Sequence, residues 1–518
     1  MAFANPFRLI GDYYSGRRTV VSHSHPIGSG EEDLIDVDLL RVLPEYNRVR
    51  DCLVGEQQVK TQREKYLPRP TADTDPTADK RYEVYLERAV FWNFTQRHHQ
   101  SLVGQAFLNE PKIQLPARME AMLENADGRG MSLIQMAKAA FSHLIAYGRC
   151  GIYADFPPVK GAVTRDQSGR YKPTIRLISP FKILSWQRND DGVLVSVLIE
   201  ETYHQRQVFV TARQLQYRQL ALTDSGYEVA IYRPSEAIDL SALSESTCLT
   251  SELLSQPALT LVKTFKPTDS SGNRLQEIPF EFAGSENNNE TVDKPPLYPL
   301  ASANLSDYRT SADLEEMLFL GGQPTVWVSD PDPEYFRENY PDGVPLGTRS
   351  ILQLGPNGQA GVVQIGASDA LSTNMLAKRQ RIADLGVTIS DMTASNKTAT
   401  EVAVQTLVNN AALVSSAHNL SDALTTVMRH AARFVGANEE EALFGLDVTK
   451  AVRDLSIEER QQMLLELEAG ILAPTEVRAA LERAGHTTLE AEAAFSEAAQ
   501  RLQGESDNGS DIEDDDDS

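Results

Sequence analysis

Residues 398–435 contain neither proline nor glycine, and this stretch constrains the fold of the chain more than any other. It opens at Thr398, whose hydroxyl can accept from the amide of Glu401 while the Glu401 carboxylate reaches back to the Thr398 amide, as in a capping box. Gly436 follows the stretch and suits the left-handed residue after a helix. Apolar residues recur three or four positions apart along it: Leu407, Val414, Ala417, Leu424, Met428, Ala431 and Val435.

The predicted helix is roughly 55 Å long, because each residue adds about 1.5 Å. One small domain cannot cover both ends of such a helix. Helices of this length usually belong to bundles, coiled coils or rings.

A shorter helix is predicted before it, over residues 367–385, with three basic residues toward its end: Lys378, Arg379 and Arg381. Residues 386–397 join the two helices. This stretch is rich in small and hydroxyl side chains, contains no proline, and ends in Ser395, Asn396 and Lys397. We interpret it as a loop that can move between two rigid helices. An ordinary surface connection is the alternative.

The charge of the chain limits the kinds of partner it can attract. The 518 residues carry a formal charge of −24, of which eight acids belong to residues 504–518, so −24 − (−8) = −16 remains for the rest. An acidic protein does not bind nucleic acid by general attraction, because neutralising phosphates requires lysine and arginine. It can still surround nucleic acid without gripping it, since like charge lowers non-specific binding.

Length and cysteine usage suggest a globular protein of two to four domains in a reducing compartment. The 41% hydrophobic content is enough to bury a substantial core. The three cysteines are far apart and predict no zinc site. We expect no signal peptide at the N-terminus, and the longest apolar run is too short to span a bilayer.

The N-terminal half is predicted to combine helices with an antiparallel meander. We expect a loose arm over 1–30, a helix over 36–60 broken once at Pro44, a helix over 80–107, and a helix from the Ser132 cap to Tyr147, followed by a strand over 150–155. From about residue 173 the apolar period becomes two, which is typical of strands. The strands of one meander are predicted at 174–178, 183–187, 193–200, 207–211 and 227–232, with further strand and loop over 235–275.

The C-terminal half is predicted to be mostly helical, with one β-rich insert. A strand over 278–282 precedes a helix over 295–320, which the Gly-Gly-Gln-Pro sequence at 321–324 ends. The polar faces of this helix are assigned to five charged residues: Asp307, Arg309, Asp313, Glu315 and Glu316. Two strand-like pieces, 325–328 and 361–364, lie in a stretch dense in proline and glycine. Short amphipathic helices are expected at 456–469 and 474–484, joined at Gly470.

This order of elements, and several local stretches, resemble bacteriophage portal proteins, which form the ring at the capsid vertex. The local stretches are Ile278-Pro-Phe280, the run from Pro296-Leu-Tyr-Pro-Leu300 to Ser311-Ala-Asp-Leu-Glu315, Phe319-Leu-Gly-Gly-Gln-Pro324, and parts of 82–111 and 124–155. The resemblance covers roughly residues 45–440, in pieces.

The resemblance implies an α+β portal fold with an α/β wing, a helical stem, a small β-rich clip, a long helix and a helical crown, assembled as a ring. Its parts would be a flexible arm (1–30), the wing (31–294), two stem helices (295–320 and 367–385), the clip (321–366), a tunnel loop (386–397), the long helix (398–436), the crown (437–503) and an acidic disordered tail (504–518). A solvated charge run without a specific partner is the alternative for the tail.

The resemblance also implies a function and partners. The protein would be a conduit for DNA packaging and ejection, a homo-oligomeric ring of twelve, and a docking platform. Its partners would be the terminase large subunit, head-completion or tail adaptor proteins, a capsid or scaffold protein, and double-stranded DNA in the channel. It would reside in the virion, at the capsid vertex, and in the host cytoplasm during assembly. The DNA-facing residues would be Ser395, Asn396, Lys397, Lys378, Arg379 and Arg381; for the last three, a solvated helix face or ion pairs between subunits is the alternative.

The sequence contains none of the short motifs that mark the common catalytic and metal-binding sites. Walker A, G-x-G-x-x-G, H-E-x-x-H, EF-hand, C-x-x-C and G-x-S-x-G patterns are all missing. We therefore expect no enzyme activity, no cofactor and no metal. Two other functions stay open at this point: a different head-to-tail connector or scaffold protein, and a cytoplasmic hydrolase with a deep polar pocket.

Overall fold

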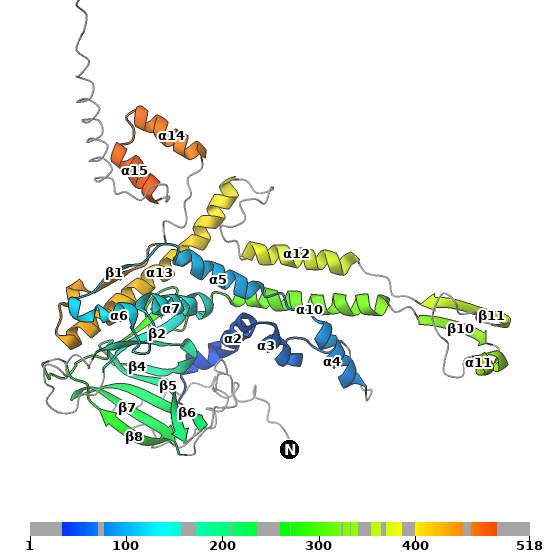
Figure 1. The fold of residues 1–518 in the computed structure, drawn as a ribbon, viewed down its shortest axis with the longest axis horizontal. Coiled ribbons are helices and arrows are strands. Elements are labelled where there is room, and N and C mark those ends of the chain that lie inside the picture. Colours follow the sequence, from blue (N-terminus) through cyan, green and yellow to red (C-terminus); the bar gives the residue numbers. More distant parts are fainter. Residues whose placement is uncertain are drawn as a thin grey trace, which may run out of the picture.

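The computed structural model describes residues 34–70, 77–156, 172–207, 210–235, 259–269, 271–322, 325–331, 333–339, 354–363, 369–385, 399–448 and 457–483. The predicted arm, tunnel loop and acidic tail lie outside these residues, as does the predicted cap at Thr398. In Figure 1 the sheets and most helices form a body, from which a pair of long helices leads to a small β unit at the far end.

The described strands between residues 149 and 284 form two antiparallel sheets rather than the one predicted meander. The smaller sheet has the order β3-β2-β9, and the larger has the order β4-β5-β6-β7-β8. The smaller sheet comprises β2 (Arg149–Asp155), β3 (Thr174–Ile178) and β9 (Phe280–Gly284). The larger comprises β4 (Ile183–Arg188), β5 (Leu194–Gln207), β6 (Val210–Thr223), β7 (Gly226–Pro234) and β8 (Leu259–Phe265).

One predicted strand was assigned to the wrong sheet, and the bounds of another were wrong. The strand predicted at 174–178 is present as β3, but it pairs with β2 and not with the following strands. The predicted strand at 207–211 spans the end of β5 and the start of β6, which pair from Ser196↔Ala221 to Gln207↔Val210. The outer half of this hairpin is polar, so its sequence lacks the apolar alternation that marks a half-buried strand.

Strand β2 is buried on both faces and lies at the centre of the body. Cys150, Ile152 and Ala154 belong to the larger hydrophobic cluster, together with residues of the long helix α13 (Ala399–Val435). Tyr153, one position out of phase, belongs to the smaller cluster between the two sheets. Because successive side chains of a strand point to opposite faces, one face of β2 packs against α13 and the other packs against the larger sheet.

The helices before the sheets begin and end differently from the prediction. Helix α2 (Val37–Val54) continues through Pro44 and ends at Gly55, which has φ 110°. The loss of one backbone hydrogen bond at proline is offset by buried side chains on both sides of it, such as Leu43 and Tyr46. α3 (Glu56–Thr61) and the 3-10 turn η1 (Arg63–Lys65) follow.

The helix predicted over 80–107 is two helices, α4 (Ala78–Arg88) and α5 (Phe94–Ala106). Asn93 begins the second one, because its side chain accepts from the Gln96 amide. The short β1 (Lys112–Gln114), η2 (Ala117–Met119) and α6 (Ala121–Glu124) come next.

Helix α7 (Leu133–Tyr147) confirms its prediction. Ser132 and Gln135 form a capping box, and Gly148, at φ 84°, ends the helix in the left-handed conformation.

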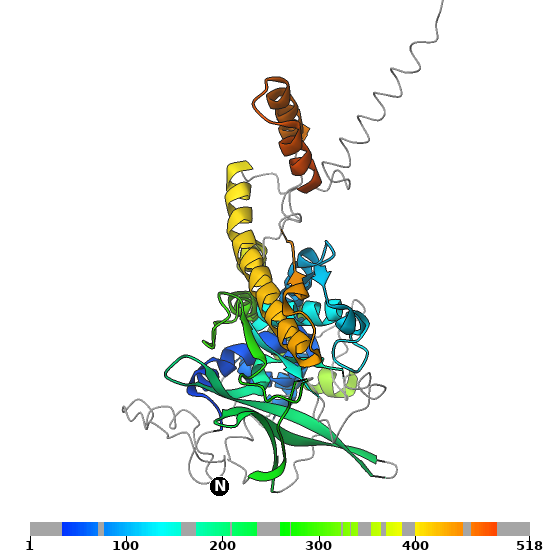
Figure 2. The ribbon, with the colours of Figure 1, turned by 90° about the vertical axis from the view of Figure 1, so that its left-hand side faces the viewer.

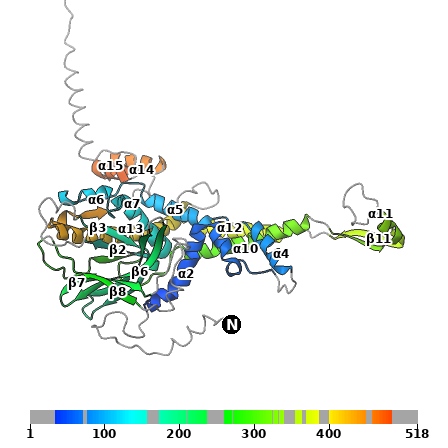
Figure 3. The same ribbon diagram turned by 60° about the horizontal axis from the view of Figure 1, so that its bottom comes forward.

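The segment after the sheets is an extended arrangement of helices around a small β unit. α10 (Tyr298–Gly321) leads to β10 (Thr325–Pro331), α11 (Pro333–Asn339) and β11 (Leu354–Val363), and α12 (Asp369–Leu385) returns. Strands β10 and β11 pair antiparallel. Figures 1 and 3 both place α10 and α12 side by side, with β11 and α11 far from the sheets.

The long helix α13 passes across the body in Figure 2. Its C-terminal part packs on β2, β3, β9 and α7, and Gly436 takes φ 63°, which confirms the predicted end. η4 (Glu439–Glu441) follows, and β12 (Leu443–Gly445) pairs with β1. α14 (Ile457–Glu468) and α15 (Pro474–Arg483) then agree closely with the two short predicted helices. With helices and antiparallel strands in largely separate parts of the chain, the fold is α+β, as predicted.

Candidate functional site

Helices α10 and α12 form the pair that carries the β unit, and α10 joins this pair to the body. The body-side half of α10 is buried, including Leu305, Tyr308 and Ala312. It packs on α2, α4 and α5. On α12, Ile382 is the buried residue among the described side chains, so most of the helix surface is exposed.

Two of the predicted DNA-facing bases are engaged with α10 of the same chain. The Lys378 ammonium donates to the Ser306 carbonyl over 3.2 Å and to the Thr310 hydroxyl over 2.5 Å. The Arg379 guanidinium donates to an Asp307 carboxylate oxygen over 3.4 Å and lies 5.5 Å from the centre of the Trp92 ring. These contacts hold α12 against α10.

Asp307 is the group on which this contact depends, and its predicted position on a polar face was wrong. Its side chain is fully buried, and its second oxygen has no hydrogen-bond partner among the described residues. Burial raises the pKa of the Asp307 carboxyl, while the positive charges of Arg379 and Lys378 lower it. The sequence offered no signal for this burial, because periodicity alone placed Asp307 with the other charged residues of α10.

The remaining candidates divide into one exposed residue and three outside the described part. Arg381 is exposed on α12. Ser395, Asn396 and Lys397 lie outside the described residues, as does the whole 386–397 loop. Of the described candidates, Arg381 is therefore the one whose side chain is exposed for contact with another molecule.

Replacing Arg379 with methionine is expected to destabilise the protein by about 2 kcal/mol, because the buried Asp307 carboxylate loses its hydrogen-bonded cation and keeps only the charge of Lys378 nearby. Adding Asp307→Asn should recover much of this loss, since the pair is then removed together. Arg381→Met on the same helix is the matched control and should stay within about 0.5 kcal/mol of wild type. Urea unfolding of wild type, Arg379→Met, Asp307→Asn and the double variant gives the coupling energy of the pair; a value near zero would show that the pair contributes nothing.

The far end of the helix pair presents apolar side chains to its surroundings. The ring of Trp327 covers Gly361 on the neighbouring strand, where an added Cβ would lie 2.7 Å from the indole nitrogen. Trp327 is 42% exposed and Val362 is 58% exposed. Tryptophan is enriched among the residues that contribute most to protein–protein interfaces, so an exposed tryptophan on a small hairpin suits contact with another protein.

Helix α13 is seated on the turn after β9 by polar contacts. The Asn419 side chain donates to the Gly284 carbonyl over 2.9 Å, and the Asn288 side chain donates to the Asn419 carbonyl over 2.8 Å. Further along, His430 lies 3.3 Å from a Glu277 oxygen and 3.7 Å from a Glu281 oxygen. The C-terminal part of the long helix is thus fixed to the body.

The part of the chain from α10 to α13 is similar to a known family of domains. Residues 296–435 match the model of a domain of unknown function, DUF4055. The match begins at α10 and ends at α13, so it contains the helix pair, the β unit and the long helix, about a quarter of the chain. No curated protein matches the chain.

Among the described helices, none is both long and apolar enough to cross a membrane. In the same residues there is no group of three or more histidine, cysteine or acidic side chains that could hold a metal ion.

Proposed function

We propose that this protein is a bacteriophage portal protein, the ring subunit through which DNA is packaged and ejected. The observation that carries the proposal is the arrangement of the DUF4055 region. Two side-by-side helices extend from the body to a small β unit, and residues 386–398 connect the returning helix to a helix of 37 residues. Long helices of this kind can line up side by side around a central channel. Head-to-tail contacts between identical subunits close into a ring when each subunit is rotated from its neighbour by a fixed angle.

In this proposal the surfaces of the chain have distinct roles. The exposed hairpin residues Trp327 and Val362 face the packaging motor and later the adaptor proteins. Arg381 and the 386–397 loop face the DNA. A few cations in an otherwise acidic tube contact phosphates briefly, and each contact is easily broken, which lets DNA slide.

Imaging of the purified protein tests the proposal. We expect closed rings of about twelve subunits with an axial hole of roughly 20 Å or more, wide enough for a DNA duplex. A variant that replaces β10 to β11 with a short flexible linker should still form rings but lose binding to the packaging motor. Monomers or dimers without an open axis would contradict the proposal. Rings that do not enter a single capsid vertex would favour a different connector.

A further inference from the structure

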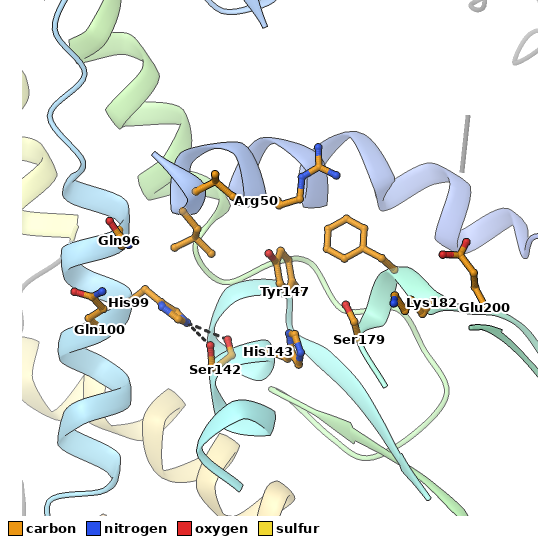
Figure 4. Close-up of a pocket in the computed structure, with 13 residues that line it drawn as sticks. Arg50, Gln96, His99, Gln100, Ser142, His143, Tyr147, Ser179, Lys182 and Glu200 are labelled. Atoms are coloured by element: carbon orange, nitrogen blue, oxygen red, sulfur yellow. Dashed lines mark hydrogen bonds between the residues drawn. The ribbon is translucent and has the colours of Figure 1, made fainter. Parts of the chain in front are cut away.

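A cleft of about 620 Å³ opens on the body. It lies where α2, α5, α7, β5 and the 3-10 turn η3 (Pro180–Lys182) meet. Figure 4 places Glu200 and Lys182 together at one end, Gln96, His99 and Gln100 at the other, and Tyr147 and His143 between them. This volume is in the range of small-molecule sites.

Glu200 is the unusual group of the cleft. Its side chain is 5% exposed, and its Oε2 has no hydrogen-bond partner among the described residues. Burial raises the pKa of the carboxyl to about 7, although the positive charge of Lys182 lowers it somewhat. No ion pair joins these two residues in the described structure. A buried carboxyl is costly unless a cation or hydrogen-bond donors satisfy it, so Glu200 has capacity for an incoming positive group.

The walls of the cleft suit a cation on an apolar body. The rings of Tyr147 and Phe181 pack edge to face with centres 5.0 Å apart, and the His143 ring lies 6.0 Å from Tyr147. Burial lowers the pKa of His143 to about 4, so its imidazole is neutral at pH 7 and can accept a hydrogen bond. The Arg50 guanidinium, 2.9 Å from an Asp51 carboxylate oxygen, lies over the Phe181 ring, 5.8 Å from its centre, so one cation already packs on this aromatic wall. Aromatic faces next to an anionic group attract organic cations.

We propose that this cleft binds a small organic cation, an alkylammonium or guanidinium group on an apolar or aromatic body, with the cation at Glu200 and the body against Tyr147 and Phe181. Neither the sequence motifs nor the portal proposal assigns a ligand here, and the site does not require a ring. The cation can come from a free amine or from a lysine or arginine side chain of a second copy of the chain.

Phenethylamine is the probe, with 2-phenylethanol as the neutral analogue and 3-phenylpropanoate as the anionic one. Calorimetry on the full chain at pH 8 should show at least tenfold tighter binding of the amine. Glu200→Gln should weaken amine binding at least tenfold, and Lys182→Gln should strengthen it a few-fold, because it removes a like charge. Asp190→Asn, the same loss of charge at an exposed turn residue, is the control and should change nothing. Amine binding should weaken as the pH falls below 7, because the carboxyl is then protonated.

Equal binding of the three probes, or full binding by Glu200→Gln, would overturn the proposal. Weaker amine binding by Lys182→Gln would also overturn it, because that residue would then be a contact for an anion or a carbonyl. The size of the assemblies, measured in parallel by light scattering, distinguishes the two sources. If the amine binds without changing the assembly size, the natural ligand is a free cation. If the amine dissociates assemblies and Glu200→Gln does the same, a basic side chain of a second copy fills the cleft.

Discussion

Replacing Gly284 with alanine is expected to destabilise the protein by about 3 to 5 kcal/mol. An added Cβ would lie 1.9 Å from the Asn287 carbonyl oxygen and 3.1 Å from an Asp293 carboxylate oxygen. The first of these is a backbone atom, so the clash is relieved only if the turn itself moves. Overpacking of this kind typically costs about 1 to 3 kcal/mol before any other contact is lost.

Moving this turn also breaks the hydrogen bonds that fix α13 to the body. The Gly284 carbonyl accepts from Asn419, and the Ser285 carbonyl accepts from the hydroxyls of Ser415 and Ser416 over 3.4 Å each. Each such hydrogen bond contributes about 1 kcal/mol. The measurement is urea unfolding, together with hydrogen exchange along residues 413–435, where protection should fall.

Gly104→Ala is the matched control with the opposite sign. Gly104 is an exposed residue within α5, and an added Cβ there would meet no atom within 4 Å. Alanine should stabilise a helix interior by about 0.5 to 1 kcal/mol relative to glycine. If Gly284→Ala unfolds at the same urea concentration as wild type, the turn after β9 does not stabilise the packing of the long helix.

How far the sequence predicted this fold depended on whether a signal was local. The helix cap at Ser132, the glycine after α13 and the two short C-terminal helices were predicted because their causes lie within a few residues. The break at 89–93 was missed, although Asn93 is a good cap, because apolar residues continue across it. The split into two sheets was missed because periodicity gives strands but not their partners.

The candidate site was predictable only in part, for a related reason. Sequence pattern placed Lys378 and Arg379 on the correct helix, but it could not show that a buried Asp307 on another helix would pair with Arg379. Glu200 also gave no signal, because an acidic residue in a strand is normally assigned to the solvent face. Both carboxyls are buried by contacts between elements distant in the sequence, and these are the contacts that periodicity does not report.

The free energy of unfolding of Glu200→Gln, measured relative to wild type, is expected to be about 2 to 3 kcal/mol higher at pH 8 than at pH 5. The carboxyl has a pKa of 4.5 in its ordinary state and about 7 in the folded protein. Between these two values the folded state holds more protons than the unfolded state, so the stability that Glu200 contributes is present at low pH. It is lost as the pH rises toward 7. Glutamine keeps the shape of the side chain but does not titrate.

The difference in unfolding free energy between wild type and Glu200→Gln reports on Glu200 alone, because neighbouring groups titrate in both proteins. Burial lowers the pKa of His143 and of His99 in the same cleft, and these groups make wild type and variant alike less stable as the pH falls. Burial raises the pKa of Tyr217, which pairs with Glu200 across β5 and β6, so its hydroxyl stays protonated from pH 5 to 8.

Urea unfolding at pH 5, 6, 7 and 8, followed by tryptophan fluorescence, gives the difference at each pH. Asp190→Asn, with an exposed carboxyl, serves as the control and should show no trend. A difference in unfolding free energy that does not change with pH would mean that the Glu200 carboxyl ionises as it does in water. Glu200 would then be neither the buried group nor the cation-binding group described above. A stabilised Glu200→Gln at pH 8 would also show that any loss of amine binding by this variant reflects the missing charge and not a failure to fold.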